Sequence, residues 1–161
     1  HARLGVGEEN SGKLVTRVRE LAKQLAETGG HTRIIVDGSP GTGCPVIASI
    51  TGADLVLAVA EPTVSGYHDL ERILALTAHF SIPCMVTVNK HDVNPDMTGA
   101  IETLARTQGA DIAGRIRYDR AVTDAMVKRQ AVTEYTQHGI AEDIGAVWEK
   151  AMKALTAGAT S

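Results

Sequence analysis

Apolar residues recur along this chain with two different periods, and the change of period marks its elements. Four short runs dense in Val, Ile, Leu and Ala are bounded by turn residues: 32–37, 54–60, 83–88 and 111–116. Such runs are typical of strands buried in a parallel sheet. The run at 111–116 is the least apolar, so we expect it to lie nearer to an edge of the sheet.

The segments between these runs carry apolar residues at helical spacing. The first predicted helix begins at Asn10 or Ser11 and stops at the Gly29-Gly30 pair. The others cover about 45–50, 65–79 with Ser65 as cap, 94–108, 120–128 and 140–155. Strands and helices that alternate with short links predict an α/β fold. We expect a three-layer sandwich, with a mainly parallel sheet and helices on both faces.

Composition and charge exclude several classes of function. Aromatic residues make up only 3% of the 161 residues, so the core must be aliphatic and a base-stacking surface for nucleic acid is not expected. The net charge is −3, without a basic patch. No apolar run approaches membrane-spanning length, and we expect neither a membrane nor a nucleic-acid partner. Cys44 and Cys84 make no disulfide framework or metal-ligand set, which favours a cytoplasmic protein.

One apolar run leads directly into an acidic residue and a loop rich in glycine. Asp37 follows Ile34-Ile35-Val36 and precedes Gly38-Ser39-Pro40-Gly41-Thr42-Gly43. Because function lies at the carboxyl ends of parallel strands, an acid here can act on Mg²⁺ directly or through water. The glycines would let backbone N–H groups approach a phosphate closely. An aspartate that only caps a turn is the alternative.

Two other strands also end in polar loops. Asn89-Lys90-His91-Asp92 follows the third run, and in many NTPases this spacing contacts the base, with Asp pairing to guanine. A polar turn between strand and helix is the alternative. Glu61-Pro62-Thr63 ends the second run. Residues 7–13 match the phosphate-loop spacing, but Leu14 stands where Ser or Thr would hold Mg²⁺, and we interpret this match as a coincidence.

Taken together, the chain resembles the MinD/ParA-like (SIMIBI-class) P-loop ATPases. It is most similar to the subgroup with an inserted ferredoxin-like iron–sulfur segment, often labelled cobyrinic acid a,c-diamide synthase-like. The matching stretches are 7–15, 35–48, 61–72 and 88–92, in the order of the family. The resemblance implies an ATP- and Mg²⁺-dependent ATPase that forms a homodimer around nucleotide and works with an iron–sulfur or metallocluster client.

The resemblance also implies roles for individual residues. Asp37 would be the Walker B acid, catalytic and in contact with Mg²⁺ directly or through water. The switch loop would supply nucleotide contacts from Gly38, Ser39, Pro40, Gly41 and Gly43. Asn89 would contact the adenine, with Lys90 and Asp92 beside it and the Glu61-Pro62 loop next to the nucleotide.

The sequence departs from the family in what it lacks. The Gly-rich phosphate loop and the cysteine-rich segment that would hold a 4Fe–4S cluster are both absent from it. We therefore expect residues 1–161 to be the C-terminal portion of a single P-loop ATPase domain, an incomplete fold that exposes an apolar strand edge. ATP hydrolysis would belong to the intact protein. Two alternatives stay open: a GTPase-like fragment that uses Asn89-Lys90-x-Asp92, and a non-catalytic interaction module.

Overall fold

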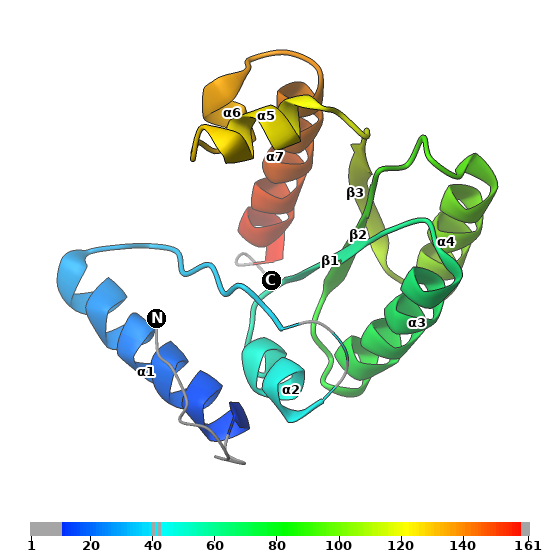
Figure 1. Ribbon diagram of the computed structural model, residues 1–161. Helices are drawn as coiled ribbons and strands as arrows, with labels where there is room; N and C mark the ends of the chain where they lie inside the picture. The colour runs from blue at the N-terminus through cyan, green and yellow to red at the C-terminus, as the bar shows by residue number, and fades with distance from the viewer. Residues whose placement is uncertain (1–10, 40, 42, 159–161) are drawn as a thin grey trace. The chain divides into compact units, whose positions relative to one another are not determined.

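The structure is a computed structural model that describes residues 11–39, 41 and 43–158 (Figure 1). The chain divides into two compact units, one up to Ala53 and one from Asp54 onward. The first unit holds α1 (Ser11–Gly29) and α2 (Cys44–Ile50). The second holds β1 (Val56–Ala60), α3 (Val64–His79), β2 (Cys84–Asn89), α4 (Pro95–Thr107), β3 (Asp111–Ile116), α5 (Ala121–Val127), α6 (Val132–Tyr135) and α7 (Ile140–Gly158).

The second unit is built around a parallel sheet of three described strands in the order β1-β2-β3. Ala58 pairs with Val86, and Val86 pairs with Ile112, so β2 is the central strand. Its residues Met85 to Val88 are all buried. β3 lies at one edge of this sheet, as its weaker apolar pattern predicted.

Helices cover both faces of this sheet, as the alternation of strands and helices predicted. α3 and α4 pack on one face, around an aliphatic core that includes Leu74, Val86 and Ile101. α7 packs against β3 on the other face, where Val147 meets Met85 and Ala113. Figure 1 shows α3 and α4 on one side of the strands and α7 on the other. The predicted α/β architecture with helices on both faces is confirmed.

The strand predicted at 32–37 is wrong: this segment belongs to no strand in the structure. Its apolar side chains are exposed, with Ile34 at 45%, Ile35 at 77% and Val36 at 37%. A β-strand requires a hydrogen-bonded neighbour, and no described residue forms a backbone hydrogen bond with this segment. The apolar pattern identified residues suited to a strand, but it could not supply the partner.

Helix ends follow local capping chemistry. α4 begins after Asn94, close to the predicted start, and the side-chain oxygen of Asn94 accepts the N–H of Met97 at 3.1 Å. The cap of α3 is Thr63 rather than the predicted Ser65, because the hydroxyl of Thr63 accepts the N–H of Gly66 at 3.0 Å. α6 was not predicted, since four residues are too few to show a helical period.

A buried acid ties α4 to β3. Glu102 is 6% exposed, and its carboxylate accepts hydrogen bonds from Arg115 Nε at 2.6 Å and Arg106 Nη2 at 3.2 Å. The hydrogen bond from Arg115 is the main reason that the pKa of Glu102 lies below its usual value. This ion-pair cluster stabilises the strand from which a candidate site loop departs.

Candidate functional site

Three loops leave the carboxyl ends of the three strands at one edge of the sheet. Ala60 pairs with Val88 and Asn89 pairs with Ile116, so the parallel strands end at nearly the same level. The predicted site residues Glu61, Pro62, Asn89, Lys90 and Asp92 all follow or end these strands. The structure therefore brings this half of the predicted site together, as parallel strand ends require.

The loops after β1 and β2 are joined by an ion pair. Lys90 Nζ lies 2.7 Å from Glu61 Oε1, with both side chains more than 40% exposed. An exposed pair of this kind adds little stability. The backbone of Lys90 has a φ of +57°, a conformation uncommon in residues other than glycine and typical of sharp turns or functional sites. Pro62 is buried, so its side chain supports the loop rather than facing solvent.

The Glu61 loop lies directly against the first turn of α3. The carbonyl oxygen of Glu61 accepts the N–H of Thr63 at 2.8 Å. A Cβ on Gly66 would stand 2.3 Å from that same oxygen and 3.1 Å from the hydroxyl of Thr63. No side chain fits at this distance, so glycine at position 66 is a condition for the conformation of the Glu61 loop.

Asn89 ends β2 with its side chain half-buried at the sheet edge. Among the described residues, its amide group forms no hydrogen bond with a protein atom. An amide offers both a donor and an acceptor, which is the chemistry that reads the edge of a base. The position of Asn89 and its unengaged amide suit the predicted contact with a purine.

Asp92 connects the loop after β2 to the loop after β3. Its Oδ1 accepts the backbone N–H of Tyr118 at 2.8 Å. This hydrogen bond is the main reason that the pKa of Asp92 is lowered, and nearby His91 and Arg117 act in the same direction. One of the two carboxylate oxygens is therefore already engaged within the protein.

The same β3 loop is held a second time by α7. Arg117 makes a two-pronged contact with Asp143, with Nε–Oδ2 at 2.6 Å and Nη2–Oδ1 at 2.8 Å. The backbone N–H of Arg117 also donates to Asp143 Oδ2 at 3.1 Å. These bonds lower the pKa of Asp143 and raise that of Arg117. Two carboxylates from two different elements thus fix the backbone of residues 117 and 118.

The remaining predicted site residues lie in the first unit. Asp37, Gly38 and Ser39 are exposed, and no hydrogen bond or ion pair to the Asp37 carboxylate is found among the described residues. Gly41 has a φ of +87°, which a residue with a side chain rarely adopts. Gly43 is the N-cap of α2, and its carbonyl oxygen accepts the N–H of Val46 at 2.9 Å. Pro40 lies outside the described residues.

In the part of the chain that the structure describes, neither a metal-binding cluster of three or more side chains nor a membrane-spanning helix is found. No group of three or more His, Cys, Asp or Glu side chains there could hold a metal ion. Within the same residues, no helix has the length and apolar character needed to cross a bilayer. Cys44 and Cys84 are free thiols.

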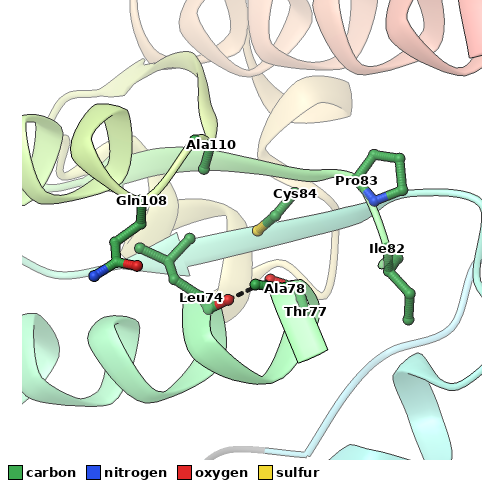
Figure 2. Close-up of a pocket in the computed structure, with 9 residues that line it drawn as sticks. Leu74, Thr77, Ala78, Ile82, Pro83, Cys84, Gln108 and Ala110 are labelled. Carbon is green, nitrogen blue, oxygen red and sulfur yellow. Dashed lines mark hydrogen bonds between the residues drawn. The ribbon is translucent and has the colours of Figure 1, made fainter. Parts of the chain in front are cut away.

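A small cavity of about 120 Å³ lies at the opposite end of the strands (Figure 2). It is lined by Leu74, Thr77 and Cys84, among others, and Thr77 donates its hydroxyl to the carbonyl of Leu74 at 3.0 Å. Burial raises the pKa of the Cys84 thiol, so the reactive thiolate is disfavoured. This cavity adds no chemistry to the loops at the carboxyl edge.

Four residues of the carboxyl edge were missed by the sequence analysis as parts of a site: Gly66, Arg117, Tyr118 and Asp143. Tyr118 follows the end of β3 closely in a chain with few aromatic residues, and this position could have identified it. The partnership of Arg117 with Asp143 spans 26 positions. No local pattern could have indicated it.

No protein-family model matches this chain. Two relatives from Methanocaldococcus jannaschii, MJ0578 and MJ0579, are described as uncharacterized proteins. MJ0578 is 37% identical over 92 residues, which are 56% of this chain and 32% of that protein. MJ0579 is 26% identical over 132 residues, 81% of this chain and 42% of that protein. The chain thus spans less than half the length of these relatives.

Similar solved structures are MinD cell division proteins. MinD of Aquifex aeolicus aligns with 86% of this chain at a TM-score of 0.71 and 19% identity, which covers 61% of that protein. The MinC:MinD complex of the same organism gives a TM-score of 0.70, with 19% identity, 86% of this chain and 59% of that one. MinD of Pyrococcus horikoshii with Mg-ADP gives 0.68, with 12% identity, 83% of this chain and 54% of that one. The chain therefore has the α/β fold of the MinD P-loop NTPases over the aligned part.

Proposed function

We propose that this chain is the nucleotide-binding, C-terminal portion of a MinD/ParA-like P-loop ATPase domain. The observation that carries the proposal is the amide of Asn89, which has no hydrogen-bond partner among the described residues and lies at the carboxyl edge of the parallel sheet, beside two anchored loops. The MinD fold supports the same function. The chain spans 61% of the A. aeolicus MinD chain, which agrees with a portion of a larger domain.

The residues present fit the base end of a nucleotide site. Asn89 would contact the purine edge, and the Glu61-Pro62 loop with Lys90 would border the nucleotide. Asp92 would act through the loop that it holds. Its Oδ1 already binds the N–H of Tyr118, while pairing to guanine uses a carboxylate with both oxygens available. We therefore propose ATP rather than GTP as the ligand.

Asp37 and the glycine-rich segment after it would act on the phosphate groups of the nucleotide. Mg²⁺, when bound, would neutralise phosphate charge. Asp37 has a carboxylate with no protein partner among the described residues, which suits a Walker B acid that contacts Mg²⁺ directly or through water. Gly38, Ser39, Pro40, Gly41 and Gly43 would form the switch loop, and the left-handed backbone of Gly41 agrees with such a role.

The intact protein would work as a cytoplasmic ATPase that forms a homodimer around nucleotide. An iron–sulfur or metallocluster protein would be its client, and any 4Fe–4S cluster would belong to a segment outside this chain. The resemblance to the ferredoxin-containing subgroup supports these assignments. MinD of A. aeolicus forms a complex with MinC, which shows a partner protein for that neighbour.

Calorimetric titration tests this function. The protein would be the longest natural reading frame that contains this sequence, titrated with Mg-ATP and with Mg-GTP. We expect ATP to bind with at least tenfold higher affinity than GTP, and Asn89→Ala to weaken ATP. Ser81→Ala, at an exposed loop position away from the carboxyl edge, is the control and should leave the affinity unchanged. A preference for GTP would favour the GTPase alternative, and no heat at millimolar nucleotide would favour an interaction module.

A further inference from the structure

An exposed aromatic side chain stands on the most firmly anchored loop of the carboxyl edge. Tyr118 is 60% exposed, although the backbone around it is held by hydrogen bonds to three carboxylates. Asp92 accepts its N–H at 2.8 Å, and Asp143 holds the preceding Arg117 through three hydrogen bonds. Asp119 then accepts the N–H of Ala121 at 2.8 Å, which fixes the start of α5.

Tyr118 differs from the other two tyrosines of the chain. Tyr67 packs on the aliphatic core and meets His68 edge-on, with ring centroids 5.7 Å apart. Lys128 Nζ lies 4.7 Å above the ring of Tyr135. For Tyr118, neither a ring contact nor a hydrogen bond of its hydroxyl is found among the described residues. A rigid backbone thus presents a ring that has no partner within this part of the chain.

The backbone that carries this ring runs next to the segment that carries the proposed base contact. Asn89 pairs with Ile116 in the sheet, and the N–H of His91 donates to the carbonyl of Ile116 at 3.2 Å. The segments that follow β2 and β3 therefore continue side by side beyond the strands, up to the hydrogen bond between Asp92 and Tyr118. A side-chain amide can hydrogen-bond to the edge of a base while an aromatic ring stacks on the face of the same base, so the two contacts are compatible.

We propose that Tyr118 stacks on the base of the bound nucleotide, and that Asp92 is the residue that positions it. The inference rests on the proposed function and deepens it. The ligand chemistry is a purine nucleotide whose edge faces Asn89 and whose flat face lies on the Tyr118 ring. Asp92 touches no part of the base in this arrangement. It holds the backbone that carries the ring.

The test compares a ligand that has a base with one that lacks it. Mg-ATP and Mg-tripolyphosphate would be titrated into the full natural protein and into Tyr118→Ala, Tyr118→Phe and Tyr135→Ala. Stacking predicts that Tyr118→Ala weakens ATP by about 5- to 100-fold and leaves tripolyphosphate unchanged. Tyr118→Phe keeps the ring and should match the wild type. Tyr135→Ala removes the ring that Lys128 covers and should have no effect.

The positioning role of Asp92 has its own readout. Asp92→Ala should weaken ATP but not tripolyphosphate, whereas Asp92→Asn keeps an oxygen that accepts the N–H of Tyr118 and should restore the affinity for ATP. Unchanged ATP affinity in Tyr118→Ala would overturn the inference. So would a loss of ATP affinity in Tyr118→Phe equal to that in Tyr118→Ala, or an equal loss for both ligands. If the wild type binds no ATP, the proposed function itself fails.

Discussion

The substitution Gly66→Ala places a methyl group against the backbone that shapes the candidate site. The new Cβ would lie 2.3 Å from the carbonyl oxygen of Glu61 and 3.1 Å from the hydroxyl of Thr63. A backbone oxygen cannot rotate away as the end of a flexible side chain can. The Glu61 loop must therefore move, and its ion pair with Lys90, now at 2.7 Å, moves with it.

The expected change in the free energy of unfolding combines one stabilising and two destabilising contributions. In a helix, alanine in place of glycine ordinarily stabilises by up to about 1 kcal/mol. Overpacking against a fixed neighbour costs about 1–3 kcal/mol. Loss of the N-cap between Thr63 and the N–H of Gly66 costs about 1 kcal/mol more. We expect a net destabilisation of about 1–3 kcal/mol, opposite in sign to the propensity effect.

Urea unfolding of the wild type and two alanine variants measures this effect. Gly99 lies in α4, where an added Cβ would meet no atom within 4 Å. Gly99→Ala is therefore the matched control, and its free energy of unfolding should stay equal or rise by up to about 1 kcal/mol. A Gly66→Ala protein as stable as the wild type, or more stable, would refute the steric argument for the Glu61 loop.

Two further predictions follow from the buried acid and the switch aspartate. Because the pKa of Glu102 is lowered by Arg115, its stabilisation is present above its usual pKa of 4.5 and is lost as the pH falls through the lower folded-state pKa. Glu102→Gln should lower the free energy of unfolding by about 1–3 kcal/mol at pH 7. Between about pH 5 and 3, the free energy of unfolding measured in urea should fall less steeply in this variant than in the wild type, and an unchanged pH profile would contradict this. Asp37→Asn should abolish ATP hydrolysis by the intact protein while its circular dichroism spectrum stays unchanged, and undiminished turnover would remove Asp37 from the mechanism.

Much of the second unit was predictable because its signals are local. The apolar runs that became β1, β2 and β3 are buried by neighbours that the same chain supplies, and Asn94 caps α4 through its own side chain. The run at 32–37 contains three consecutive β-branched apolar residues, yet it forms no strand. Its outcome depends on a hydrogen-bonded neighbour, which composition cannot reveal.

The candidate site also has a part that could be predicted from the sequence and a part that could not. Asn89 and Glu61 could be placed at one sheet edge from the sequence, because parallel strands end together. The engagement of Asp92 with Tyr118, and of Arg117 with Asp143, depends on tertiary contacts across 26 positions. Because of its contact with Tyr118, we propose that Asp92 holds a loop rather than pairing with guanine.

Hydrogen exchange with and without Mg-ATP tests the central claim most directly. The claim is that nucleotide binds at the carboxyl edge formed by the loops after β2 and β3. Measured on the full natural protein, amides of residues 89–93 and 117–119 should exchange more slowly when Mg-ATP is bound, while those lining the cavity near Cys84 should not change. Binding of Mg-ATP without protection of either loop would contradict the account.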